Sequence, residues 1–126
     1  MVTDKTYEQQ AREWLDGGRP DGLLLAGVAL VALNCWLNRY RDTLPPAVCA
    51  VIEAFRRAAE ARQPDGWFHT VLQQRSTCTS CGTRYRIENL SICVRCHDLY
   101  CYQCIGQCRP DGAGHRLCLC GGELVG

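Results

Sequence analysis

The sequence predicts a small α+β protein in which a helical N-terminal half is followed by a compact, cysteine-rich half. Two observations lead to this prediction. Apolar residues recur at helical spacing in three stretches before residue 66. From Trp67 onward this periodicity gives way to short apolar runs and to eight cysteines in four close pairs. We therefore divide the chain of 126 residues into a helical domain, 1–66, and a cysteine-rich domain, 67–126.

Each of the three expected helices is bounded by residues that start or stop helices. The first carries an apolar stripe over Tyr7–Leu15, and Gly17 stops it. The second is expected to begin behind Asp21 as its N-cap and to run to about Arg39. The third starts at Pro46, because proline suits a first helical turn, and carries a stripe over Val48–Ala59.

The apolar run Leu23–Leu33 needs cover on every side. Its eleven residues are too few to span a bilayer, which takes about 20, so no membrane segment is expected. Two small helices cannot wrap it completely. We expect it to pack against the cysteine-rich half, a second copy of the chain or another protein, and we predict a homodimer through residues 22–40.

The cysteines are arranged for metal binding rather than for disulfides. A two-residue turn between cysteines aims both sulfurs at one ion, and four sulfurs complete the tetrahedron that zinc prefers. An odd total, eleven, would be a poor disulfide framework. We therefore predict two structural zinc ions. The four pairs are Cys78/Cys81, Cys93/Cys96, Cys101/Cys104 and Cys118/Cys120.

Only four residues separate Cys96 from Cys101, so sites built from consecutive pairs would place two charged clusters almost in contact. We favour interleaved pairs on these geometric grounds. The first site is then Cys78, Cys81, Cys101 and Cys104, and the second is Cys93, Cys96, Cys118 and Cys120. His115 stays open as a substitute ligand in the second site, because two residues separate it from Cys118.

The net charge of the chain and its expected location limit the classes of function that fit it. The first twenty residues have mixed charge and lack the basic start and apolar stretch of a secretory signal, so we expect a cytoplasmic location. The formal net charge is only +1, and eight thiolates outweigh the charge of two zinc ions. Nucleic-acid binding is therefore disfavoured. A closed four-thiolate site has no open position for water, and we find no intrinsic active site.

The spacing C-x2-C-x11-C-x2-C-x4-C-x2-C with a following fourth pair resembles the cross-braced, two-zinc treble-clef fingers, namely RING, PHD and FYVE domains. The resemblance covers about Cys78 to Cys120. It implies a short helix opened by the third pair, from Cys101 to about Cys108. The chain lacks the basic run of FYVE domains, and Arg116 stands where PHD fingers carry an aromatic residue. The bias toward alanine, leucine and arginine suggests a GC-rich, prokaryotic type of genome.

The resemblance to RING fingers implies a ubiquitin-ligase scaffold that recruits a conjugating enzyme carrying ubiquitin or a ubiquitin-like protein. RING ligases offer the surface over both metal loops and beside the central helix. The corresponding residues here are Thr79, Ser80, Leu99, Tyr100 and Ile105, with Leu117 or Leu119 at the edge. The alternative is a protein-interaction adaptor without transfer activity, in which zinc replaces a core that about 60 residues cannot supply.

Overall fold

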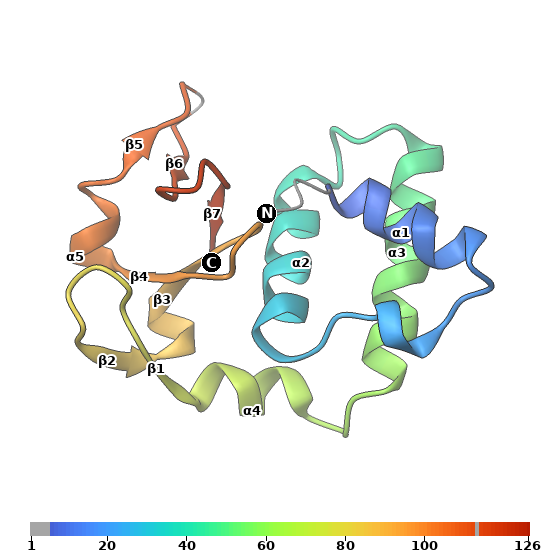
Figure 1. Ribbon diagram of the computed structural model, residues 1–126, viewed down its shortest axis with the longest axis horizontal. Coiled ribbons are helices and arrows are strands. Elements are labelled where there is room, and N and C mark those ends of the chain that lie inside the picture. Colours follow the sequence, from blue (N-terminus) through green and yellow to red (C-terminus); the bar gives the residue numbers. More distant parts are fainter. Residues whose placement is uncertain (1–5, 113) are drawn as a thin grey trace. The chain divides into compact units, whose positions relative to one another are not determined.

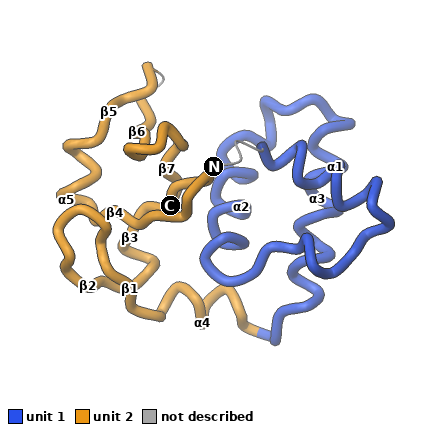
Figure 2. Tube along the Cα trace, viewed as in Figure 1, with its two compact units in different colours: residues 1–65 blue, residues 66–126 orange. Residues whose placement is uncertain are grey.

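The computed structural model describes residues 6–112 and 114–126. The chain divides into two compact units, one up to Asp65 and the other from Gly66 onward (Figure 2). The first unit is helical, whereas the second carries all the strands of the described residues (Figure 1). None of the helices in the described ranges has the length and apolar character needed to cross a membrane.

Helix α1, Tyr7–Asp16, begins with a capping box. The Thr6 hydroxyl accepts a hydrogen bond from the Gln9 amide, and the Gln9 side chain accepts one from the Thr6 amide. These bonds satisfy two donors that the helix itself leaves unpaired. The helix buries Tyr7, Ala11 and Trp14 as the stripe predicts, but Leu15 stays exposed.

Helix α2, Gly27–Tyr40, begins five residues later than expected, so Asp21 is not its N-cap. A short 3-10 turn, η1, covers Asp21–Leu23 instead. Leu24 and Ala26 then adopt extended backbone conformations, which delays the helix until Gly27. The apolar run is therefore divided. Leu23 is exposed, whereas Leu30–Leu33 is buried.

Helix α3, Pro46–Ala61, starts at the expected proline and packs against both α1 and α2. Its buried residues are Ile52, Phe55 and Ala59, which lie on the predicted stripe. The Phe55 ring lies 5.7 Å from that of Trp14 on α1. Aromatic pairs at such distances contribute beyond the area they bury, so this contact joins the two helices at the centre of the unit.

Helix α3 also carries a half-buried group of charges centred on Glu53. The Glu53 carboxylate accepts hydrogen bonds from Arg56, at 2.8 Å, and from Arg41. Arg56 bonds Glu60 as well, at 2.8 Å. Burial alone would raise the pKa of Glu53, but the Arg56 hydrogen bond and the positive charges of Arg56 and Arg41 outweigh it and lower the pKa.

The second unit opens with a helix that the sequence analysis did not predict, α4, Trp67–Gln73. It follows Gly66, which adopts a left-handed φ of 74° that glycine accepts without strain. Only Val71 is buried, so seven residues give too little apolar periodicity to be recognised. The end of α4 contacts the 3-10 turn η2, Ile87–Asn89, where the Ile87 amide donates to the Gln74 carbonyl.

Two antiparallel hairpins follow, and each carries a cysteine pair at its turn. Strand β1, Arg75–Thr77, pairs with β2, Arg84–Arg86. Strand β3, Leu90–Cys93, pairs with β4, Leu99–Cys101.

The remaining elements close the unit. Strand β7, Leu124–Val125, adds to β3, while β5, Arg109–Pro110, pairs with β6, Arg116–Leu117. Helix α5 covers only Tyr102–Ile105 and stops short of the expected end near Cys108. The next amides bond three residues back rather than four, Gln107 to Cys104 and Cys108 to Ile105, so the helix tightens into turns.

Candidate metal centres

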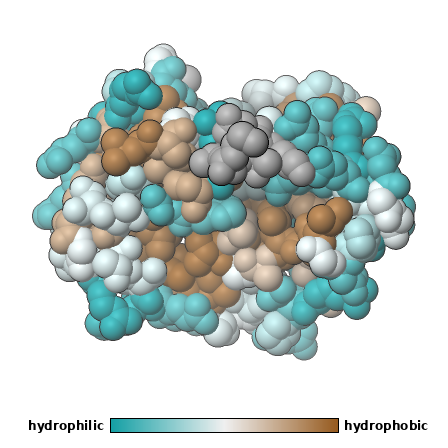
Figure 3. All heavy atoms as spheres, viewed as in Figure 1, coloured by the Kyte–Doolittle hydropathy of each residue, from teal (hydrophilic) through white to brown (hydrophobic). Residues whose placement is uncertain are grey.

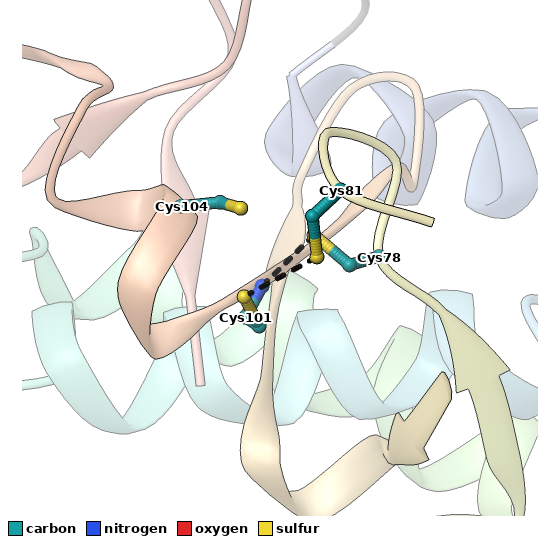
Figure 4. Close-up of side chains that lie close together, drawn as sticks. All are labelled: Cys78, Cys81, Cys101 and Cys104. Carbon is teal, nitrogen blue, oxygen red and sulfur yellow. Dashed lines mark hydrogen bonds between the residues drawn. The ribbon is translucent and has the colours of Figure 1, made fainter. Parts of the chain in front are cut away.

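The first cysteine cluster joins the turn of the β1–β2 hairpin to the end of β4 and to α5. It consists of Cys78, Cys81, Cys101 and Cys104, whose sulfurs all lie within 4.8 Å of one another. Figure 4 shows Cys78 and Cys81 on the hairpin loop, Cys101 at the end of its strand and Cys104 on the helix. The sulfurs of Cys81 and Cys101 are 3.9 Å apart.

The second cluster joins the turn of the β3–β4 hairpin to the turn between β6 and β7. Its members are Cys93, Cys96, Cys118 and Cys120, again with all sulfurs within 4.8 Å. Cys120 Sγ lies 3.4 Å from Cys93 Sγ and 3.5 Å from Cys96 Sγ. Cys96 Sγ is also 3.5 Å from Cys118 Sγ.

These separations suit a single ion in each cluster. A zinc ion with four sulfurs at 2.3 Å in a tetrahedron would separate neighbouring sulfurs by about 3.8 Å. The sulfur–sulfur distances given above, from 3.4 to 3.9 Å, lie on either side of that value. The pairs are interleaved, since the first cluster takes the first and third pairs and the second takes the second and fourth. Two clusters of four cysteines in a cross-braced arrangement could therefore each hold a metal ion.

Backbone amides in the first cluster donate hydrogen bonds that stabilise negatively charged sulfur. The Cys101 amide donates to Cys78 Sγ at 3.4 Å. Burial would raise the pKa of Cys78, but amide hydrogen bonds from Cys81, Cys101 and Ser80 outweigh it and lower the pKa to about 6. Similar hydrogen bonds, first from the Cys104 amide, lower the pKa of Cys101. In the metal-free protein, a hydrogen bond with the Ser80 side chain lowers the pKa of Cys104, but the neighbouring thiols and burial outweigh it and raise that pKa to about 12.

The second cluster is more strongly desolvated. Burial raises the pKa of Cys93 and of Cys96. Cys120 is the exception, because hydrogen bonds led by the Gly122 amide, at 3.4 Å, overcome burial and lower its pKa. Protons therefore compete for sulfur more strongly at Cys93 and Cys96 than at Cys78.

A close approach at Gly122 explains one of the two glycines that follow the last cysteine pair. A Cβ atom there would lie 2.5 Å from Cys93 Sγ, far inside van der Waals contact. The Gly122 carbonyl also accepts the Cys118 amide, at 2.8 Å, which closes the turn that carries both ligands. Gly121 has a left-handed φ of 90°.

The second cluster is packed into the core of its unit. Cys93 and Cys118 form a buried group with Tyr100 and Leu124. The hydroxyl oxygen of Tyr100 lies 3.3 Å from Cys118 Sγ. That hydrogen bond, and then burial, raise the pKa of Tyr100, so its hydroxyl stays protonated and can donate to a thiolate.

His115, left open above as a substitute ligand, does not lie in the second cluster. The structure groups it with Asp111 and Glu123 instead. Its Nδ1 lies 3.4 Å from Asp111 Oδ2 and 3.7 Å from Glu123 Oε1. Both cysteines of the fourth pair, Cys118 and Cys120, face the other two sulfurs of the cluster.

The residues expected to form a docking surface are only partly together. Thr79, Ser80 and Tyr100 line one groove of about 540 Å³, which also includes Leu117 and Leu119. On the face shown in Figure 3, apolar side chains gather over β5 and β6.

The structure places the other two expected docking residues elsewhere. Leu99 is buried, and its backbone bonds Thr79, whose amide donates to the Leu99 carbonyl at 2.7 Å. Ile105 lines a separate groove beside Tyr102. Two further residues, not predicted from the sequence, line the first groove: Gln107 in the turn after α5 and Arg109 on β5. Leu119 is 95% exposed and is the most prominent apolar side chain of this groove.

The donor sets decide what the clusters can do chemically. Four thiolates occupy all the coordination positions of a tetrahedral metal ion. No position is left for water or substrate, which is typical of structural sites. Each ion would instead tie together chain segments about twenty residues apart. Comparison with protein-family models, with curated proteins and with solved structures finds no match for this chain.

Proposed function

We propose that the two clusters each hold a zinc ion and that residues 67–126 form a cross-braced treble-clef finger of the RING-like type. Thiolate sulfur is a soft ligand that suits zinc, and the cysteine-only clusters match its tetrahedral preference. The hairpin carrying the first pair, the strand leading to the third and the short helix α5 are consistent with that fold. The alternation of the pairs between the two clusters supports cross-bracing.

The function that this geometry supports best is that of a scaffold that recruits a conjugating enzyme charged with ubiquitin or a ubiquitin-like protein. The observation that carries the proposal is the groove between the two metal loops, with Thr79 and Ser80 on one side and Leu119 on the other. An almost fully exposed leucine between two metal ligands is held in place by rigid neighbours. Such apolar anchors dominate the affinity of protein interfaces.

The role of each groove residue follows from its exposure. Tyr100 is only 3% exposed and contacts Cys118, so it supports the floor of the groove rather than anchoring a partner. Leu119, which is almost fully exposed, takes the anchoring role. Arg109 and Gln107 supply polar contacts at the rim, where charged groups set the orientation of a partner.

The test is discharge of a charged conjugating enzyme by the purified, metal-loaded chain. A panel of conjugating enzymes carrying ubiquitin or a ubiquitin-like protein is incubated with free lysine, and loss of the thioester is followed over time. The intact chain should accelerate discharge from at least one enzyme. Leu119→Ala should reduce that acceleration by at least about tenfold, as loss of an interface anchor does.

Leu15→Ala is the matched control, because Leu15 is an exposed leucine on α1 of the helical unit. It should leave discharge unchanged, and both variants should retain their metal. If the chain binds a conjugating enzyme through Leu119 without accelerating discharge, the module is an adaptor rather than a ligase scaffold. If no enzyme of the panel binds, recruitment of conjugating enzymes is wrong.

A further inference from the structure

A third group of metal-ligating side chains lies outside the two cysteine clusters. Asp111, His115 and Glu123 each offer one atom, and these three atoms lie within 4.8 Å of one another. We infer that these residues form a third metal site, which takes a divalent transition-metal ion through one imidazole nitrogen and two carboxylate oxygens. This inference does not depend on the proposed ligase function.

The distances match ligands that share an ion. His115 Nδ1 is 3.4 Å from Asp111 Oδ2 and 3.7 Å from Glu123 Oε1. Ligands at roughly 2.1 Å from a tetrahedral ion stand about 3.4 Å apart. A charge-assisted hydrogen bond between nitrogen and carboxylate is shorter, at about 2.7–2.9 Å. The separations therefore match those of ligands around one ion, and they are longer than a short charge-assisted hydrogen bond.

The backbone holds Asp111 and His115 in register. The Asp111 amide donates to the His115 carbonyl at 2.9 Å, and the His115 amide donates to Asp111 Oδ1 at 3.0 Å. This second bond uses one carboxylate oxygen and turns the other, Oδ2, toward the imidazole. Both residues close the β5–β6 hairpin, so the pairing of Arg109 with Leu117 sets their separation.

Glu123 reaches the same point from another segment. It forms a β-bridge opposite Leu117 at the end of β6, and its carbonyl accepts the Val94 amide at 3.0 Å. The site is therefore built by two segments, and backbone pairing with Leu117 holds both of them in place. Preorganised ligands lose little conformational entropy on binding, which favours a real site over a chance meeting of side chains.

Burial and donor chemistry indicate the type of ion. His115 Nδ1 is buried, while the side chains of Asp111 and Glu123 are 19% and 16% exposed, so the site is partly desolvated but open on one side. Three protein ligands leave at least one position for water. Mixed nitrogen and oxygen donors suit Mn²⁺, Zn²⁺ and similar ions, and do not share the preference of thiolates for soft metals. The site should therefore bind more weakly than the cysteine clusters and exchange its ion.

The test titrates Mn²⁺ into the zinc-loaded full chain and follows free Mn²⁺ by electron paramagnetic resonance. Mn²⁺ stands low in the affinity order and does not displace zinc from thiolates, so it reports on this site alone. We expect about one Mn²⁺ per chain. Glu123→Gln and His115→Gln should each weaken binding by at least about tenfold, as loss of one ligand does.

Glu88→Gln is the control, because it removes the same charge from a residue near α4, where Glu88 accepts a hydrogen bond from Gln73. It should bind Mn²⁺ like the wild type. Wild-type protein that shows no saturable binding up to about 1 mM Mn²⁺, the range of weak protein sites, overturns the inference. Equal weakening of Mn²⁺ binding by Glu88→Gln and Glu123→Gln also overturns the inference, since it would indicate general attraction to surface charge.

A second measurement covers variants that fail to fold. In wild-type protein, one equivalent of Mn²⁺ should broaden the amide resonances of Asp111, His115 and Glu123 before all others in the same unit. Broadening centred on the cysteine loops, or spread evenly over the acidic residues, would count against the site.

Discussion

The hydroxyl oxygen of Tyr100 lies 3.3 Å from the sulfur of Cys118, inside the buried group that surrounds the second cysteine cluster. With a metal bound, Cys118 is a thiolate and only the phenol can donate. Hydrogen bonds to a metal ligand orient it and spread its charge, so Tyr100 belongs to the metal centre although it binds no metal itself.

Removing that hydroxyl should loosen one ion and not the other. Tyr100→Phe should keep both ions but weaken retention of the second by roughly tenfold, because a hydrogen bond to a charged group contributes about 1.5–3 kcal/mol. Competition with a chelator of known affinity would show this as two separate steps. Tyr102→Phe, at a tyrosine that is 70% exposed, should leave both steps where they are in the wild type. A single unchanged step for Tyr100→Phe would contradict the assigned role.

Loss of one cysteine ligand should release the bound ion and unfold the part of the chain that the ion stabilises. Cys78→Ala and Cys93→Ala should each reduce metal content below two per chain and unfold the cysteine-rich unit, because structural zinc contributes on the order of 10 kcal/mol. Elemental analysis and near-UV circular dichroism measure the two effects. Cys108→Ala is the control, since Cys108 lies outside both clusters. Loss of an ion in that control would mean that the ligand sets are wrong.

Acid should release metal from both clusters. Metal binds thiolates, so protons compete for the ligands and affinity falls as pH falls. In the metal-free protein each cluster contains a thiol whose pKa is raised, Cys104 in the first and Cys93 and Cys96 in the second. Amide resonances of both cysteine loops, followed from neutrality into acid, should change as metal is released. Loops that keep their resonances after all the metal has been released would contradict this prediction.

The charge group on α3 predicts a pH-dependent stability for the helical unit. The pKa of Glu53 is lowered from 4.5, so its contribution is present above that pH and is lost as pH falls through the lower, folded-state value. Glu53→Gln should reduce the free energy of unfolding by about 1 kcal/mol at pH 7. The difference from wild type should narrow below pH 4.5.

Urea denaturation of the full chain measures the effect of Glu53→Gln. Glu8→Gln, which removes an exposed pair with Arg12, is the control and should change stability by less than about 0.5 kcal/mol. A difference for Glu53→Gln that is the same at every pH would mean that its charge is not the cause.

Association through residues 22–40 stays a prediction. Leu30–Leu33 is buried within one chain, so a second copy would have to use neighbours such as Leu23, which is 46% exposed. Sedimentation of the intact chain should give the mass of a dimer, and Leu23→Glu should reduce it to that of a monomer. A wild-type monomer at high concentration would rule this homodimer out.

The cysteine clusters could be predicted because the spacing of cysteines in the sequence limits where their sulfurs can lie. A pair at C-x2-C fixes two sulfurs on one turn, and the short link between Cys96 and Cys101 favours interleaved pairs. Helix α3 could be predicted for a similar reason, because Pro46 and a long apolar stripe together indicate a helix. In both cases the signal is local and repeated several times.

What the sequence did not predict depends on single residues or on distant segments. Helix α4 spans seven residues and buries only Val71, too little for a period to show. The start of α2 depends on extended backbone at Leu24 and Ala26, which no residue type demands. The grouping of His115 with Glu123 brings together two separate segments of the chain. Pairings of this kind are set by tertiary structure.

The interleaving of the cysteine pairs also has a consequence for synthesis on the ribosome. When Cys104 emerges, three cysteine pairs are present, and the first and third of these must come together to form the first cluster. Cys93 and Cys96 have no partners yet, because Cys118 and Cys120 lie more than twenty residues further along the chain. Because chains emerge at about 5–20 residues per second, that wait lasts on the order of seconds. A β3–β4 hairpin formed during this interval would hold Cys101 at the far end of its ladder from Cys93, and would so disfavour capture of an ion in the wrong pairing.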